Sequence, residues 1–415
     1  MEKSSSAIVV SEPETKKITK GEMYRPWSEL TYPIVEMIYG GLEFLDKCQM
    51  VSVCNSWRNV APEFARRCLQ QVVPWLLISY DAQSREAFGL LNLHDNLIHQ
   101  TRIPQINMKL CLGSSQGWLF MFEDARDQPF FRTCFLLNPF TKSRIQLPSF
   151  RIAEPPNAVH KVMLSSDPRI SQDWTVIGLA SRGLIFYKPG FRSWSIGLPR
   201  TRNWYPCDDR DIIFLDGKVY ALGMLHSLWV FDMETQKYSL KSSGVSPNYD
   251  LNRDNDTIDD GYISYLVESN GEIFLVSRFL ENIRKPCTAS NISLTSECFE
   301  CQTASIHYVT LNFLLYKLIK NDNRRKRTKY IWARQPSLGA DQVLFLSKSG
   351  SKSVSTIENP MLHGNSIYFV NDLHPGNGKP CDIGIYHFQD GQFEPLAQIE
   401  SYPLEFPLVW ITPSL

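Results

Sequence analysis

The sequence predicts a mainly β protein with a small all-α module near its N-terminus, followed by a β-propeller for which we count six blades and leave seven open. Three observations lead to this fold class. The apolar period changes from helical to alternating at Trp75, a strand–turn–strand pattern recurs at the spacing of a propeller blade, and strands at both ends of the β region can share one blade.

Composition excludes several classes of protein. Lys+Arg and Asp+Glu balance at 43 each, so no global field favours nucleic acid or a membrane surface, and we expect neither as a partner. Residues 1–24 are polar and lack the apolar segment of a secretory signal, which predicts a disordered tail and a protein inside the cell, in the cytoplasm, the nucleus or both. The 10 cysteines are scattered, as reduced thiols are, and predict no disulfide framework.

Residues 25–70 have a helical period and form the predicted all-α module. Its first apolar face carries Leu30, Ile34, Met37, Ile38 and Leu42. These positions share one side of a helix, which Pro33 can open in its first turn.

Two further helices are predicted in the same module. Asp46 and Gln49 have the spacing of a capping box, which predicts a second helix through Cys48, Val51 and Cys54. A third, short helix carries Trp57 and Val60. A module of this size rarely closes a core unaided, so its apolar side needs the following domain or a second protein.

Residues 75–412 form the predicted propeller. A strand, a polar turn and a second strand recur, and the first turn residue of each copy is Asn92, Asn138, Lys188, Asp232 and Gln389. The spacings are 46, 50, 44 and 157, the last being about three periods or two with an insertion. We place that insertion around residues 280–305, in the fifth blade.

A second repeated pattern is a glycine turn that opens into an aromatic strand, as in DGKVYAL from Asp216 and NGEIFLV from Asn270. The β region also begins and ends with a strand, Trp75–Ser79 and Leu408–Thr412. Propellers commonly seal their ring by pairing strands from the two ends, which removes open sheet edges.

The helical module resembles an F-box. It has a Trp-Ser-x-Leu segment from Trp27, and it ends in Val53-Cys54-x-Ser56-Trp57-Arg58. The usual Leu-Pro of that motif is replaced here, because Thr31 follows Leu30 and Pro33 comes later.

The β half resembles the propeller-like domain found in a large family of plant F-box proteins. The matching segments are Gly113–Pro148, Ser337–Leu346, Gly364–Asp372 and Trp410–Ser414. Together with the helical module, residues 25–70, which we call the head, the resemblance spans nearly the whole chain.

What this resemblance implies is a non-catalytic substrate-recognition subunit of an SCF-type (cullin-RING) ubiquitin ligase, without cofactor, metal or catalytic residues. The head would dock on a Skp-family adaptor and through it on a cullin, while the propeller holds an unidentified target protein. The residues expected at the docking surface are Leu30, Pro33, Ile34, Ile38, Leu42, Val53, Cys54 and Trp57. Among them we expect Trp57 to contribute most to binding.

Two alternatives stay open. A propeller enzyme of the glycosidase or lactonase type would gather carboxylates or histidines at the central channel. A propeller scaffold without a role in ubiquitylation would not retain a Skp-family adaptor.

Three motifs suggest other chemistry. Ser115 lies in a Gly-x-Ser-x-Gly, but the strand after Gly117 predicts a turn where a nucleophile elbow would need a helix. Cys298 and Cys301 form a single Cys-x-x-Cys, whereas structural zinc sites usually show two such pairs. The basic run Arg324-Arg325-Lys326-Arg327 is interpreted as a hairpin tip, and a nuclear signal stays open.

Overall fold

The computed structural model describes residues 27–42, 44–50, 53–59, 73–79, 87–102, 111–124, 131–151, 159–180, 183–197, 211–242, 261–283, 307–321, 329–370, 382–396 and 405–414. The chain divides into two compact units, Met1–Ala61 and Pro62–Leu415.

The N-terminal unit is helical. Its elements are a 3-10 helix η1 (Trp27–Glu29) and the helices α1 (Tyr32–Gly41), α2 (Phe44–Met50) and α3 (Asn55–Arg58). The three predicted helices are therefore present within the part of this unit that the structure describes.

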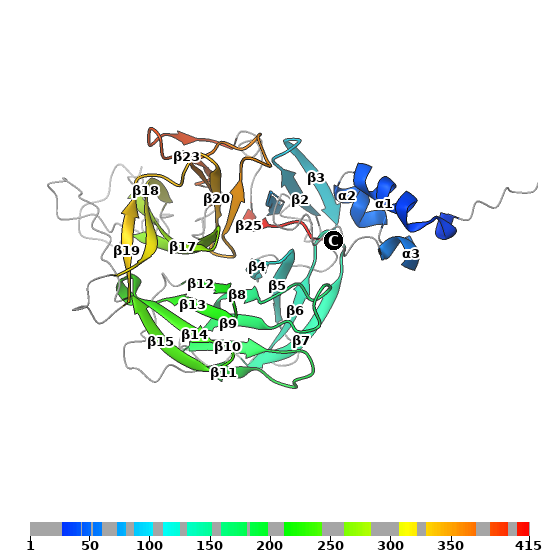
Figure 1. Cartoon of the computed structure of the whole chain (residues 1–415), viewed down its shortest axis with the longest axis horizontal. Helices are drawn as coiled ribbons and strands as arrows, with labels where there is room; N and C mark the ends of the chain where they lie inside the picture. Colours follow the sequence, from blue (N-terminus) through cyan, green and yellow to red (C-terminus); the bar gives the residue numbers. More distant parts are fainter. Residues whose placement is uncertain are drawn as a thin grey trace, which may run out of the picture. The chain divides into compact units, whose positions relative to one another are not determined.

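The second unit is a six-bladed β-propeller (Figure 1). Blade 1 consists of β25 (Glu405–Ile411), β1 (Trp75–Ser79), β2 (Ala87–Asn92) and β3 (Leu97–Arg102). Blade 2 consists of β4 (Cys111–Ser115), β5 (Trp118–Asp124), β6 (Phe131–Leu137) and β7 (Arg144–Arg151). Blade 3 consists of β8 (Val159–Leu164), β9 (Val176–Ala180), β10 (Gly183–Tyr187) and β11 (Ser195–Gly197). Blade 4 consists of β12 (Ile212–Leu215), β13 (Lys218–Leu222), β14 (Leu228–Asp232) and β15 (Lys237–Ser242). Blade 5 consists of β16 (Tyr262–Ser269), β17 (Glu272–Ile283), β18 (His307–Lys320) and β19 (Tyr330–Gln335). Blade 6 consists of β20 (Gln342–Leu346), β21 (Lys352–Ser355), β22 (Ser366–Phe369), β23 (Gly384–His387) and β24 (Phe393–Glu394).

Blade 1 closes the ring, as the sequence predicts. Its strand order is β25-β1-β2-β3, so the last strand of the propeller lies beside the first. The two strands are antiparallel, with Trp75 opposite Ile411 and Leu76 opposite Trp410. Because this pairing satisfies the backbone of both chain ends, neither strand remains an open edge on that side.

Blade 6 departs from the simple up-and-down order of the other five sheets. Its order is β21-β20-β22-β23-β24, and β20 pairs with β22 in parallel. The chain thus enters this blade at the second strand, turns inward to β21 and crosses back to β22. The innermost strand of blade 6 is therefore β21, which lies beside β16 of blade 5.

Three blades have the same two-residue turn between their first and second strands. The turns are Gln116–Gly117, Asp216–Gly217 and Asn270–Gly271, with φ of 53° and 77°, 48° and 71°, and 52° and 77°. Two successive residues with positive φ make a type I′ turn, which matches the twist of an antiparallel hairpin. This geometry explains the glycine turns that the sequence repeats before its aromatic strands.

The five predicted turn residues all lie at the hairpins between outer strands. At three of them a side-chain oxygen accepts backbone N–H groups within the turn. Asn92 Oδ1 accepts from His94 at 3.0 Å, Asn138 Oδ1 from Thr141 at 2.9 Å and Asp232 Oδ1 from Thr235 at 2.9 Å. Such Asx turns explain why Asn and Asp recur at this position.

The spacing of 157 residues runs from Asp232 in blade 4 to Gln389 in blade 6 and so covers two blades. Of the two interpretations of this spacing, three periods or two periods with an insertion, the second is therefore correct. The stretch between β17 and β18, which includes most of the predicted insertion and Cys298 and Cys301, lies outside the described residues. Also outside the described residues are the basic run 324–327, the predicted N-terminal tail, Val51 and Val60.

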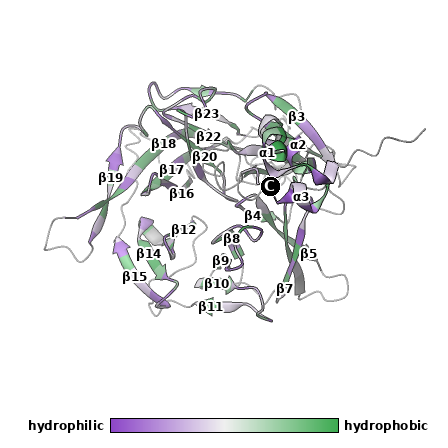
Figure 2. Cartoon of the chain, turned by 45° about the vertical axis from the view of Figure 1, so that its right-hand side comes forward, coloured by the Kyte–Doolittle hydropathy of each residue, from purple (hydrophilic) through white to green (hydrophobic). Residues whose placement is uncertain are grey.

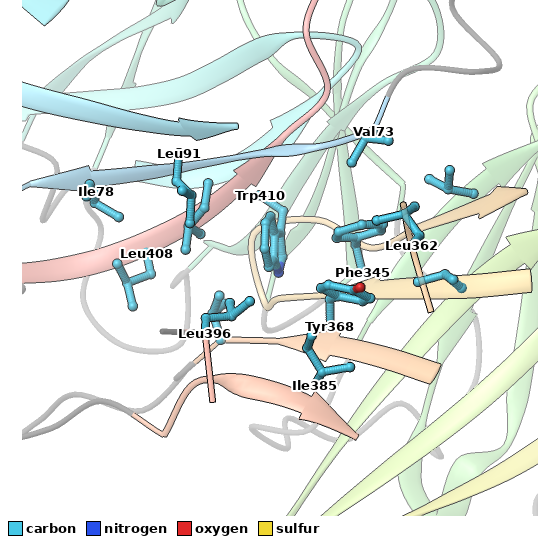
Figure 3. Packing of buried hydrophobic residues seen from close by; sticks show 14 residues of the cluster. Val73, Ile78, Leu91, Phe345, Leu362, Tyr368, Ile385, Leu396, Leu408 and Trp410 are labelled. Carbon is cyan, nitrogen blue, oxygen red and sulfur yellow. The ribbon is translucent and has the colours of Figure 1, made fainter. Parts of the chain in front are cut away.

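The apolar core lies between neighbouring blades. The cluster shared by blades 1 and 6 joins Trp410 of β25 to Phe345 of β20 in an edge-on contact, with ring centroids 5.0 Å apart (Figure 3). Phe345 stacks in turn on Tyr368 of β22 at 4.9 Å. Comparable clusters join blades 2 and 3, 3 and 4, 4 and 5, and 5 and 6. Each buried side chain of this size stabilises the fold by about 1.5–3 kcal/mol.

Within the described ranges, no helix is both long and apolar enough to cross a lipid bilayer.

Candidate functional site

Helix α1 forms where the sequence provides a start and a stop. The carbonyl oxygen of Thr31 accepts from the N–H groups of Ile34 at 3.0 Å and Val35 at 3.1 Å, and Pro33 occupies the first turn, where its missing N–H costs nothing. The helix ends at Gly40 and Gly41, and Leu42 then takes an extended conformation.

Helix α1 is apolar on two sides, and the two sides differ in exposure. Val35 and Tyr39, one turn apart, are 1% and 0% exposed. Ile34 and Met37 are 41% and 71% exposed. Green, hydrophobic stretches are visible on α1 in Figure 2. Since an exposed Ile–Met pair on one helix is unfavourable in water, this side of α1 is suited to bind another protein.

Helix α2 corrects one expectation. Asp46 was predicted to cap the second helix from outside, but α2 begins at Phe44, so Asp46 lies within its first turn. Its carboxylate there still opposes the positive end of the helix dipole. The helix ends at Met50, and Cys54, expected inside it, is the residue before α3. Cys48 and Met50 are buried.

Helix α3 is joined to η1 through Trp57. The indole Nε1 of Trp57 donates a hydrogen bond of 2.9 Å to the backbone oxygen of Trp27. The tryptophan predicted to contribute most to docking therefore also connects α3 to η1.

None of the eight predicted docking residues is buried. Pro33, Ile34 and Val53 are exposed, and Leu30, Ile38, Leu42, Cys54 and Trp57 are intermediate. Val53, in the turn between α2 and α3, is 61% exposed. The set thus lies where another protein can reach it.

Three exposed apolar side chains of the same unit were not in the predicted set. Trp27, Tyr32 and Met37 are each more than two-fifths exposed. Met37 could have been included, because it follows Ile34 by three positions and shares its helical side. We call these three residues together with Ile34 and Val53 the exposed head surface.

The propeller gives no support for hydrolase chemistry at Ser115. This residue ends β4, and the turn at Gln116–Gly117 leads into β5 without a helix. Its Oγ accepts the backbone N–H of Leu164 in β8 at 3.1 Å. Ser115 therefore joins the inner strands of blades 2 and 3.

A cavity of about 800 Å³, partly open to solvent, lies among the inner strands of the propeller blades. Among the described residues, its lining includes two carboxylates, Glu268 and Glu358, and two lysines, Lys161 and Lys352, but no histidine. Nowhere in the described part of the chain do three or more His, Cys, Asp or Glu side chains gather as metal ligands would.

The chain is similar to curated plant proteins over nearly its full length. It is 25% identical over 411 residues to F-box protein At2g05970 of Arabidopsis thaliana, with 94% of this chain and 96% of that one covered. A second relative from the same plant is 24% identical over 391 residues, covering 90% of each chain. F-box protein At1g49360, also from Arabidopsis thaliana, is 25% identical over 278 residues, covering 63% of this chain and 52% of its own.

Likeness to solved structures is weak. A crystal structure that is titled as a 6-phosphogluconolactonase from Bacteroides uniformis matches at 9% identity. The match covers 83% of this chain and 98% of that one, with a TM-score of 0.31. The Swd1 β-propeller domain of Myceliophteria thermophila covers 65% and 89% at 8% identity, with a TM-score of 0.29. Neither match carries an argument about function.

A helical head with an exposed apolar side, a closed six-bladed propeller and these relatives define a plant F-box protein with a C-terminal propeller. The chain belongs to the KIB1-4 beta-propeller family, whose model matches residues 90–387.

Proposed function

We propose that this chain is a non-catalytic substrate-recognition subunit of an SCF-type ubiquitin ligase. Its head docks on a Skp-family adaptor and through it on a cullin, and its propeller binds a target protein. The assembly acts inside the cell. The names of the relatives support the F-box assignment.

The observation that carries the proposal is the exposed head surface. Helix α1 buries Val35 and Tyr39 while leaving Ile34 and Met37 in solvent. Polar residues at Ile34 and Met37 would have served solubility better, so their apolar character favours a partner with an apolar surface of its own.

The test substitutes residues that the head does not need for its own structure. Ile34→Ala combined with Val53→Ala removes exposed apolar groups without touching the hydrogen bond between Trp57 and Trp27. Burial of two such side chains contributes on the order of 2–4 kcal/mol. We therefore expect adaptor binding to weaken by about thirtyfold or more in a titration with a purified plant Skp-family adaptor.

The matched control is Phe191→Ala, which removes a 66% exposed aromatic side chain from blade 3. It should leave adaptor affinity unchanged. Equal adaptor affinity for the wild type and the Ile34→Ala/Val53→Ala variant would refute the docking assignment. Trp57→Ala is a weaker test, because it also removes the bond to Trp27.

A further inference from the structure

The first and last helices described in the N-terminal unit meet through a pair of tryptophans. Trp57 lies in α3, and its indole Nε1 donates to the backbone oxygen of Trp27 in η1 at 2.9 Å. The two residues are 30 positions apart in the sequence. The bond is therefore a tertiary contact and belongs to neither helix.

Neither η1 nor α3 is held in place by a buried side chain. η1 has three residues and α3 has four, and none of them is buried. Such short helices gain little from their own hydrogen bonds, because forming the first turn fixes several dihedral angles for a single bond. Cys54, which precedes α3, adds no side-chain cap. The placement of both elements therefore depends on their contacts with each other.

The bond from Trp57 is the hydrogen bond that ties η1 to the other helices. Within the part of the unit that the structure describes, residues Trp27 to Leu30 make no other hydrogen bond to α1, α2 or α3. By contrast, α1 is anchored by Val35 and Tyr39, which are both buried. Loss of the Trp57 bond would thus free η1 and leave α1 in place.

The two tryptophans offer different groups to a partner. Trp27 is 53% exposed, and among the described residues its indole N–H donates to none. Trp57 is less exposed, and its indole N–H is already used in the bond to η1. An exposed indole with an apolar ring and an unused donor is the kind of side chain that dominates binding at protein interfaces.

Trp27 extends the exposed head surface beyond α1. Tyr32, Ile34 and Met37 of that surface lie on α1, whereas Trp27 lies on η1, which comes just before α1 in the chain. The orientation of η1 relative to α1 therefore decides whether Trp27 can bind the same partner as the α1 residues. That orientation depends on the bond from Trp57.

We propose that Trp57 is a positioning residue for adaptor binding, whose indole N–H holds η1 so that Trp27 contacts the adaptor directly. This inference rests on the proposed function, since it concerns the same docking surface. The largest aromatic contact is then made by Trp27, and Trp57 acts through it.

The experiment is a double-mutant cycle on the full chain, with affinity for a purified plant Skp-family adaptor measured by isothermal titration. Trp57→Phe removes the indole N–H and keeps an aromatic ring. Loss of one hydrogen bond of this kind should weaken adaptor binding by about two- to tenfold. Trp27→Ala removes the proposed contact and should weaken binding by about thirtyfold or more.

The decisive variant combines Trp27→Ala with Trp57→Phe. If Trp57 acts through Trp27, this variant should bind the adaptor as Trp27→Ala alone does, because the side chain that Trp57 positions is already absent. Two independent contacts would give losses that multiply. Multiplied losses, or wild-type affinity in Trp57→Phe, would overturn the positioning role.

Trp194→Phe is the matched control. Trp194 Nε1 donates to the backbone oxygen of Pro148 at 3.0 Å, which joins blade 3 to blade 2. The substitution therefore removes the same kind of bond from the propeller, and it should leave adaptor affinity unchanged. Equal losses in Trp194→Phe and Trp57→Phe would count against a specific role for Trp57.

A second measurement follows η1 in the chain without adaptor. Glu29 is an exposed residue of η1, so a glutamate-specific protease cuts after it when η1 opens. Trp57→Phe should speed this cleavage by about two- to tenfold, since one hydrogen bond is lost. Trp27→Ala should be cut at the wild-type rate, because its backbone oxygen still accepts from Trp57.

The two measurements separate failure of this inference from failure of the proposed function. A wild-type chain that does not bind the adaptor would overturn the proposed function and this inference with it. If the wild type binds, multiplied losses in the cycle or an unchanged cleavage rate in Trp57→Phe would overturn this inference alone.

Discussion

Lys352 offers a stability test whose sign and size follow from its position. Burial holds its pKa at about 8 against an ordinary value of 10.5. Between these two pH values the unfolded chain binds more protons than the folded chain, so this residue makes stability rise with pH across that window. Below about pH 8 its destabilising effect is fully present, and above about pH 10.5 it is absent.

Replacing Lys352 with Met should therefore stabilise the protein at neutral pH. Each tenfold change in proton affinity corresponds to about 1.4 kcal/mol, so the displacement from 10.5 to about 8 sets an upper limit of about 3.5 kcal/mol. Lys352 keeps some contact with solvent, which lowers the expected gain to about 1–2 kcal/mol.

The assay is urea unfolding of the full chain, followed by fluorescence, at about pH 7 and about pH 10.5. The other charged groups facing the cavity, Lys161, Glu268 and Glu358, are the same in both proteins. Lys348→Met, at an exposed position, should change stability by less than about 0.5 kcal/mol. A gain for Lys352→Met that is as large at the higher pH, or a loss at neutral pH, would refute this reasoning.

Two further predictions concern the joints between blades. Arg278 is buried and donates to the Asp382 carboxylate at 2.8 Å, joining blade 5 to blade 6. Arg278→Met should lower the free energy of unfolding, measured in urea, by about 3–5 kcal/mol, because it leaves the Asp382 carboxylate without its partner. Adding Asp382→Asn should recover part of this loss, and no recovery would mean that the lost charge pairing is not the cause. Ser414 Oγ donates to Gln116 O at 2.9 Å and accepts from Arg169 Nη2 at 2.7 Å. Ser414→Ala should lower the free energy of unfolding by about 1–2 kcal/mol and lower the melting temperature. An unchanged melting temperature would contradict a role for Ser414 in ring closure.

Local signals explain why most of the propeller could be predicted. The Asx turns at Asn92, Asn138 and Asp232 and the type I′ glycine turns are fixed by a few adjacent residues. The pairing of Trp75–Ser79 with the C-terminal strand is long-range, but it follows from the need to cover two strand edges.

Blade 6 shows where that reasoning stops. The parallel pairing of β20 with β22 and the inward position of β21 have no local sequence signal, because no short turn connects parallel strands. The cavity was missed for the same reason. Lys161 and Lys352 lie far apart in the sequence, and only the closed ring brings them to one space.

The head was predicted in part. Helical spacing identified Ile34 and Ile38, but it did not show that Val35 and Tyr39 form a separate, buried side. Nor did it predict that Trp57 donates to Trp27, because that bond depends on how α3 meets η1. Periodicity locates an apolar side of a helix and leaves open which of two such sides is buried.

Polar links between blades have a role that the apolar clusters cannot fill. Apolar contact is less directional than a hydrogen bond, so a cluster such as Phe345 with Trp410 constrains the register of neighbouring sheets less strictly. Hydrogen bonds and ion pairs are directional, and a buried one left unmade is costly. Asp211 fixes blades 3, 4 and 5 relative to one another, and Arg278 fixes blade 5 to blade 6. Asn138 Nδ2, which donates to Ser414 O at 3.1 Å, joins blade 2 to the segment that follows the closing strand. These links therefore select one register for the ring, and a fixed register is what keeps residues from six separate blades at constant positions around the central cavity.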